Sequence, residues 1–203
     1  MHSVTDSSQN NLPLDHALKE WAVAVRALEE GRTTLVVRKG GIREKSFAVP
    51  ESRFLLLPGF EHQRPELIKP EYRDLLEGLE HRSDSGPLRF TSFVEVVGAY
   101  EVSEKSELDA LEPYHMWSPE YAESRFKWRP KKPLTTLVLR AYLLPEPVVL
   151  PFRDFYGGCR SFVSLEDSVE ADDVRPALTD AEFGRASAPA LSVLEGFARA
   201  EVG

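Results

Sequence analysis

The segment LRFTSFVEVVGAYEV, residues 88–102, constrains the fold more than any other stretch of the chain. Its side chains alternate between two faces with the period of two that β-strands have. The pattern predicts a long strand with one buried face, and Gly98 marks an expected bulge. The buried face is predicted to carry Leu88, Phe90, Ser92, Val94, Val96, Gly98, Tyr100 and Val102.

Other apolar runs predict the partners of this strand. Leu134–Leu144 alternates in the same way, and the run RFLLLP, residues 53–58, is short, apolar and bounded by turn signals. Residues 148–152 and 160–165 are expected to add short strands. The sum predicts an α+β fold with a mainly antiparallel sheet and a few short helices packed on it, and a barrel-like sheet is the alternative.

Two interpretations fit residues 21–38, WAVAVRALEEGRTTLVVR. Two β-rich runs flank Glu-Glu-Gly-Arg, which predicts a hairpin with Gly31 at a positive φ. Because Ala, Leu and Glu are good helix formers, an amphipathic helix over residues 15–30 is the alternative. We favour the hairpin, preceded by a short helical turn over Pro13–Glu20.

Helix signals occur in the middle of the chain. Pro70–Leu79 begins with a proline that suits a first helical turn, and Ser106–Leu111 predicts another turn of helix. Ser118 is the expected N-cap of a third helix. That helix has to end by Arg129, because Pro130 disfavours helical geometry in the residue before it.

Charge is spread unevenly over the chain. The net charge is −8, but residues 164–203 hold nine acidic residues against three arginines, so the rest is nearly neutral. We expect residues 1–12 to be a disordered leader, residues 13–169 a single α+β domain, and residues 170–203 an acidic C-terminal segment. That segment is predicted to end in a helix, Pro189–Glu201, with an apolar stripe of Leu191, Leu194, Phe197 and Ala198.

Composition excludes several classes of protein. The 203 residues contain no run of eighteen apolar residues that would span a membrane, and the polar start lacks the pattern of a secretory signal. A single cysteine, Cys159, makes neither an internal disulfide nor a zinc site of several thiolates. We expect a cytoplasmic protein without a membrane contact, and the sequence predicts no metal site and no cofactor.

The stretch YHMWSPEYAESRFKWRPKK, residues 114–132, mixes cationic and aromatic side chains. Basic groups beside stacking rings suit a phosphate backbone with splayed bases, so the stretch predicts a nucleic-acid-binding surface. The alternative is an amphipathic helix whose aromatic residues are core and whose cations are only solvated. The residues expected to contact nucleic acid are Arg125, Lys127, Arg129, Lys131, Lys132, Trp117 and Trp128.

Histidine and cysteine supply a second hypothesis. His115 precedes a helix N-terminus, and a pair with Cys159 or His62 would serve acid–base or nucleophilic chemistry. Arg160 would favour the thiolate of Cys159, whereas the alternative is a buried thiol at a tight turn. Further candidate positions are polar or glycine residues in three short stretches: Lys39, Gly40, Gly41, Gln63, Tyr156, Gly158 and Arg160.

These motifs together resemble a known family. The uncharacterised bacterial family known as domain of unknown function 1802 is similar in four segments, ALKEWAVAVRALEEGRTTLVVRKGG, RFLLLPGFEHQ, YHMWSPEYAESRFKWRPKKPLTTLVLRAY and YGGCRSFV. The resemblance covers about residues 15–170. It implies a role in DNA restriction or defence, because members are thought to occur beside restriction-endonuclease-like domains, but it transfers no catalytic residue.

Three functions are therefore expected, in order of preference. The first is a nucleic-acid-associated accessory module, with DNA or RNA and a restriction-type nuclease on another chain as partners. The second is a small-molecule enzyme that uses His115 with Cys159 or His62. The third is a protein-interaction scaffold whose terminal helix docks a partner through Leu191, Leu194 and Phe197.

Overall fold

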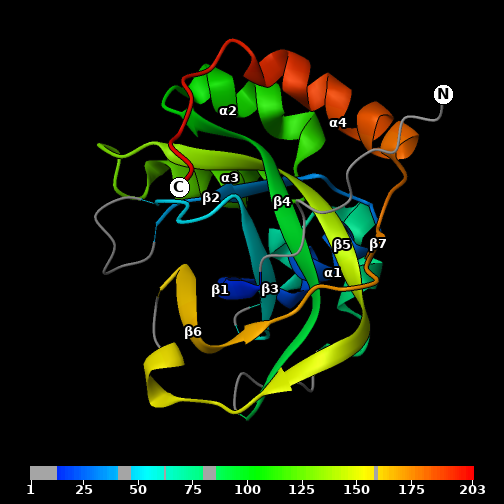
Figure 1. The fold of residues 1–203 in the computed structure, drawn as a ribbon. Coiled ribbons are helices and arrows are strands. Elements are labelled where there is room, and N and C mark those ends of the chain that lie inside the picture. The colour runs from blue at the N-terminus through cyan, green and yellow to red at the C-terminus, as the bar shows by residue number, and fades with distance from the viewer. Residues whose placement is uncertain (1–12, 41–46, 62, 80–85, 158–159) are drawn as a thin grey trace, which may run out of the picture.

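One mixed sheet forms the centre of the fold (Figure 1). The computed structural model describes residues 13–40, 47–61, 63–79, 86–157 and 160–203. In these residues the strands are β1 (Leu14–Trp21), β2 (Leu35–Arg38), β3 (Arg53–Gly59), β4 (Leu88–Val102), β5 (Leu134–Leu150), β6 (Phe162–Val169) and β7 (Arg175–Pro176).

The strand order is β2-β5-β4-β3-β1-β6, and β7 pairs with β5. β1 and β3 run parallel, whereas the other pairs are antiparallel. The predicted α+β fold with a mainly antiparallel sheet is confirmed. In the described parts of the chain no pairing joins β2 to β6, so the sheet is open and does not close into the barrel of the alternative.

Helices pack against the sheet and lie above it in the view of Figure 1. The α-helices are α1 (Ala22–Glu29), α2 (Lys105–Leu111), α3 (Pro119–Lys127) and α4 (Asp180–Leu194), and 3₁₀ segments cover Pro65–Leu67, Pro70–Leu76, Glu112–Tyr114 and Asp154–Tyr156. α1 packs against β3 and β5, and α2 lies beside α4 at the top of Figure 1. The predicted turn over residues 106–111 and the helix after Ser118 are present, whereas the helix predicted for residues 70–79 is a 3₁₀ segment that ends at Leu76.

The long strand predicted for residues 88–102 is confirmed with the same bounds. β4 pairs with β5 along its whole length, and the register shifts between Val96 and Gly98, where the bulge was expected. β5 continues to Leu150, so two segments that were predicted separately belong to one strand. These two strands are the longest in the sheet and cross the centre of Figure 1.

The hairpin predicted for residues 21–38 is wrong. Its first half is helix α1, so the helical alternative holds there, although residues 14–21 form β1. The helical turn predicted for Pro13–Glu20 is also wrong, because Leu14–Trp21 form strand β1. α1 is buried on nearly every side, and the packing of its small side chains overrides the β-propensity of its valines. Gly31 has the predicted positive φ, 68°, but it follows the end of this helix.

The helix predicted for Pro189–Glu201 lies earlier in the chain. α4 starts after Thr179 because the side chains of Thr179 and Glu182 form a capping box, and it ends at Leu194 with Pro189 inside it. The Thr-x-x-Glu signal was present in the sequence. The proline was taken for a first helical residue, although the helix accommodates it in its last turns.

The residues after α4 return to the sheet. Arg199 forms a bridge with β4, and Val202 forms another with the segment before β3. Leu194 is fully buried, and Leu191 and Phe197 are half-buried against the same core. The apolar stripe proposed as a docking surface therefore packs inside this molecule.

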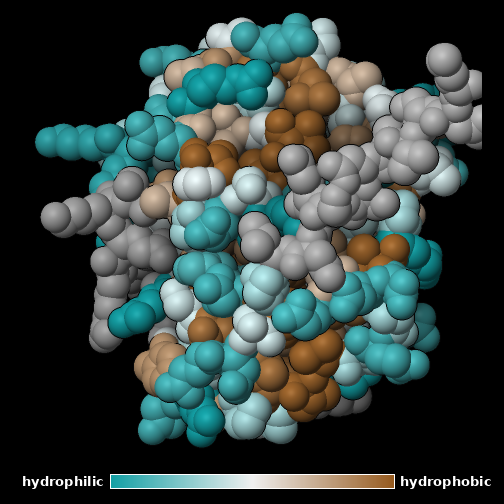
Figure 2. Space-filling model, in the orientation of Figure 1, coloured by the Kyte–Doolittle hydropathy of each residue, from teal (hydrophilic) through white to brown (hydrophobic). Residues whose placement is uncertain are grey.

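The largest apolar cluster lies where the four α-helices meet the sheet. Each helix contributes a buried side chain, Val23 from α1, Leu111 from α2, Ala122 from α3 and Leu194 from α4, and Val102 joins them from β4. Figure 2 shows one face of the molecule, where apolar residues gather along the middle and hydrophilic residues surround them. Burial of this kind is the main favourable term in folding.

We predict that Gly31→Ala lowers the free energy of unfolding by about 1–3 kcal/mol. The backbone of Gly31 has φ 68°, and a Cβ built there would collide with the side chain of Leu178. Urea unfolding would measure the loss. Adding Leu178→Ala should cost less in the Gly31→Ala protein than in the wild type, because the collision is then relieved. Equal costs in both backgrounds would contradict this contact.

Candidate functional site

A cleft of about 390 Å³ opens where three strand ends meet. β1 and β2 end beside it, with Trp21 and Arg38 as their last residues. β6 runs antiparallel to β1, and the backbone N–H of Lys19 donates to the carbonyl oxygen of Ser161 at 2.8 Å. This register brings the start of β6 to the end of β1.

Helix α3 forms another wall, and its local signals act as predicted. Ser118 is the N-cap, and its hydroxyl accepts a hydrogen bond from the backbone N–H of Tyr121 at 3.3 Å. The helix ends at Lys127, within the predicted limit. Ala122 is buried, and Tyr121 and Arg125 line the cleft.

Aromatic rings line much of the cleft. The ring centroids of Trp21, Trp117 and Tyr121 lie 5.0, 5.4 and 5.2 Å apart in pairs, so the three rings form one cluster. Trp128 stands apart from them. The guanidinium carbons of Arg125 and Arg129 lie 4.5 and 4.6 Å from its ring centroid, which are cation–π distances. Trp117 is 6% exposed and belongs largely to the core.

Cations outnumber carboxylates around the cleft. Of the described residues that line it, Arg38, Lys39, Arg125 and Arg160 are cationic and Glu20 is acidic. The carboxylate of Glu20 is buried and binds the guanidinium of Arg38, with Oε2 and Nη1 2.9 Å apart. This pair neutralises one cation, and the others keep an excess of positive charge in the cleft.

Burial also affects the cations next to this pair. It lowers the pKa of Arg125, and the positive charge of Arg38 acts in the same direction. Burial lowers the pKa of Lys39, and Arg125 adds to that effect. The Lys39 amine donates to the carbonyl oxygen of Phe126 at 2.9 Å, which fixes it against α3. An anion bound here would relieve repulsion among these like charges.

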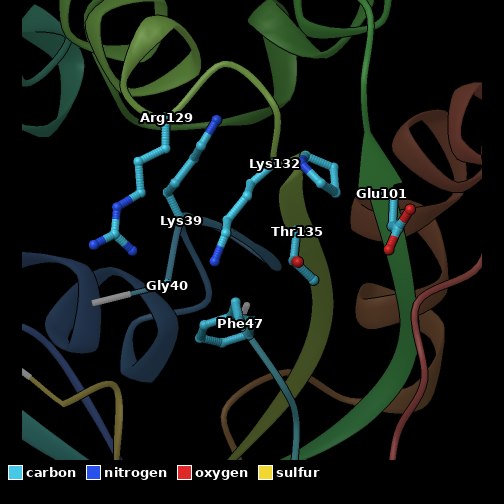
Figure 3. A pocket seen from close by; sticks show the side chains of 8 residues that line it. Lys39, Gly40, Phe47, Glu101, Arg129, Lys132 and Thr135 are labelled. Carbon is cyan, nitrogen blue, oxygen red and sulfur yellow. The ribbon is translucent and has the colours of Figure 1, made fainter. Parts of the chain in front are cut away.

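A smaller hollow shares Lys39 with the cleft (Figure 3). Its volume is about 80 Å³, and Arg129, Lys132 and Thr135 are among its walls. The other described residues that line it are Gly40, Phe47, Glu101 and Pro133. Because Lys39 lines both spaces, the hollow and the cleft are neighbours.

The cations predicted to bind nucleic acid lie in different places in the structure. Arg125 lines the cleft, and Arg129 and Lys132 line the small hollow. Lys127 and Lys131 line neither space, and Lys127 forms an ion pair with Glu123 at 2.6 Å. Of the two tryptophans, Trp128 is half-buried and Trp117 is buried, yet both line the cleft.

The other predicted site residues have varied surroundings. Lys39 and Arg160 join the cleft and Gly40 joins the small hollow. Gln63 accepts from the backbone N–H of Val23 at 2.8 Å and so satisfies the start of α1. Tyr156 is buried, and its hydroxyl accepts from the backbone N–H of Glu166 at 3.0 Å. Four predicted positions lie outside the described residues: Gly41, His62, Gly158 and Cys159.

His115 is buried and lines neither space. Its side chain is 2% exposed, and neither ring nitrogen has a hydrogen-bond partner among the described residues. Burial lowers the pKa of His115 to about 4, and the nearby charge of Lys69 adds to this while Glu112 opposes it. The imidazole is therefore neutral at physiological pH and enclosed by protein.

Four charged or aromatic cleft residues were not among the functional candidates. Glu20 and Trp21 come from segments for which only secondary structure was predicted, and Arg38 ends the second strand of the predicted hairpin. Tyr121 lies in the predicted nucleic-acid-binding stretch but was not among the residues expected to make contact. A glutamate directly before the apolar run of residues 21–25 was the available signal for Glu20. Its pairing with Arg38 depends on the arrangement of β1 and β2, which no local pattern specifies.

The described residues contain neither a cluster of metal ligands nor a membrane-spanning helix. No group of three or more His, Cys, Asp or Glu side chains is placed to hold a metal ion in the described part of the chain. None of the described helices combines the length and the apolar character that crossing a membrane requires.

The comparisons with known proteins show the family. Residues 17–188 match the family described as Domain of unknown function (DUF1802), and the chain belongs to that family. The resemblance found in the sequence is confirmed, and the match extends further toward the C-terminus than the motifs did. No curated protein and no solved structure matches the chain.

We predict that His115 makes stability pH-dependent. Its pKa is about 4 in the folded protein and 6.5 ordinarily, so the unfolded chain takes up the proton first as the pH falls. The stability that neutral His115 confers is complete above pH 6.5 and is lost between about 6.5 and 4. The loss is on the order of 3 kcal/mol.

Urea unfolding of the wild type and His115→Leu at pH 7 and pH 4 would measure this. Carboxylates also titrate in that range, so the difference between the two proteins isolates the histidine. The variant should lose less stability on acidification than the wild type. The same loss in both proteins would show that His115 is not the group responsible.

Proposed function

We propose that this protein binds single-stranded nucleic acid in the cleft between α3 and the ends of β1, β2 and β6. The observation that carries the proposal is the meeting of Arg38, Arg125 and Arg160 with a cluster of aromatic rings in one concave space. Guanidinium groups bind phosphate oxygens through paired hydrogen bonds, and aromatic rings accept bases. Residues 117–128 supply both parts, and Trp21, Arg38 and Arg160 add to them from other segments of the chain.

Phosphate contacts would fall mainly to Arg125 and Arg160. Arg38 shares its charge with Glu20, and its Nε is buried without a hydrogen-bond partner in the described residues. Arg125 lies against the ring of Trp128, which holds the guanidinium plane in place. An arginine that is already ordered loses less conformational entropy when it binds an anion.

A single strand suits the cleft better than a duplex. A volume of about 390 Å³ takes one or two nucleotides, and a duplex hides the base faces that aromatic rings contact. Two guanidinium groups already lie over the ring of Trp128, so the base would instead contact Trp21 and Tyr121 or the plane of Arg125. Trp117 would support the rings of Trp21 and Tyr121 by packing against both.

The other two functions have weaker support. An enzyme that uses His115 would need the imidazole to reach a ligand, and His115 lines neither space. A scaffold that docks a partner through Leu191, Leu194 and Phe197 would need those side chains exposed, and they pack against the core. A role in DNA restriction or defence, beside a restriction-type nuclease on another chain, stays a prediction implied by the family resemblance.

We predict that Arg125→Gln weakens binding of a single-stranded oligonucleotide roughly tenfold and lowers the salt slope by about 1. The change removes one phosphate contact from the cleft. Fluorescence anisotropy with single- and double-stranded DNA and RNA at several salt concentrations would measure both quantities. The single strands should bind more tightly than the duplexes.

Lys127→Gln is the matched control, because it removes one positive charge from the same helix outside the cleft. It should change the affinity by less than about twofold. Thermal unfolding of each variant would show that the fold is kept. No binding of any oligonucleotide at low salt, or equal losses in both variants, would refute the proposed site.

A further inference from the structure

The small hollow beside the cleft has the size of one oxyanion. Its volume of about 80 Å³ corresponds to two or three water molecules at about 30 Å³ each. A tetrahedral phosphate group fits such a space, whereas a sugar or a base does not. Gly40 and Thr135, which line the hollow, are buried.

The charges around the hollow favour an anion. In Figure 3 the amine of Lys132 lies between the guanidinium of Arg129 and the hydroxyl of Thr135. The amine of Lys39 points away toward α3. Among the described residues of the lining the carboxylate is that of Glu101, which pairs across β4 and β5 with Thr135 and lies beyond that hydroxyl as seen from Lys132.

Two cations and a hydroxyl suit a phosphate monoester better than a diester. A monoester carries a charge of about −1.5 to −2 at pH 7 and three terminal oxygens that accept hydrogen bonds. A diester carries one charge and continues as chain on both sides. The hollow has room for a phosphate group but not for a sugar on each side of it, so a strand can end there but not pass through.

We propose that the hollow binds a terminal phosphate monoester of the strand held in the cleft, so that the protein recognises phosphorylated strand ends. The inference rests on the proposed function and names its substrate more narrowly. Lys39, the shared wall, places the end of the strand next to the bases and phosphates in the cleft. Lys132 and Arg129 bind the terminal phosphate, and Thr135 donates its hydroxyl.

The test compares one single-stranded sequence with three kinds of end. Internally labelled DNA and RNA strands would carry a 5′-phosphate, a 3′-phosphate or hydroxyls at both ends, with binding measured by anisotropy at fixed salt. One phosphorylated form should bind roughly tenfold more tightly than the strand with hydroxyl ends. Inorganic phosphate and a mononucleotide should compete only at much higher concentrations, because they lack the contacts in the cleft.

Variants assign the preference to the hollow. Lys132→Gln should abolish the preference for a phosphorylated end and leave affinity for the hydroxyl-ended strand within about twofold. Lys132→Arg should keep the preference. Lys131→Gln is the matched control, because Lys131 is an exposed neighbour that lines neither space. Thermal unfolding of each variant checks that the fold is kept.

The outcomes separate this inference from the proposed function. Equal affinity for all three strands would overturn the strand-end inference and leave binding in the cleft intact. No binding of any strand would overturn both. Competition by a mononucleotide at the same concentration as the phosphorylated strand would also overturn strand-end recognition, since the hollow would then serve free phosphate compounds.

Discussion

The pairing of β4 with β5 is the constraint on which the rest of the structure depends. The ladder extends from Leu88 and Leu150 at one end to Val102 and Leu134 at the other. β2 and β7 pair with β5, and β3 pairs with β4 and is followed in the sheet by β1 and β6. The position of every other strand therefore depends on the pair of β4 and β5. The bulges bend the pair, which lets helices pack against a curved surface.

Local signals made a good part of this fold predictable. β4 and the helix after Ser118 follow from alternation and from a capping residue, and both signals act within a few residues. The helix that α1 forms was only the alternative to a hairpin, because valine and alanine in a short run suit a buried helix and a strand equally well and only the neighbours decide. Only part of the cleft could be predicted from the sequence. Its cations and aromatic residues on α3 are contiguous in sequence, whereas Glu20 and Arg38 meet them only through the parallel pairing of β1 with β3 and the position of β2.

The cleft also shows how an acidic protein can present a basic site. The net charge is −8, and much of it lies in the last forty residues. Local charge density governs what binds at a concave surface, because screening limits the reach of distant charges to about 10 Å at ordinary salt. Glu20 is buried and paired with Arg38, so its charge neutralises only that one cation. The other cations keep the cleft positive although the whole sequence is acidic.

The ends of the segment between β4 and β5 have a consequence of their own. Val102 and Leu134 are direct partners in the ladder, so residues 103–133 leave and rejoin the sheet at adjacent positions. This segment carries α2 and α3 and supplies Trp117, Tyr121 and Arg125 to the cleft. It is therefore an insert with a fixed anchor. Its exposed positions can change without altering the register between β4 and β5, so that what the protein recognises can diverge in evolution while the sheet and the buried side chains beneath it stay the same.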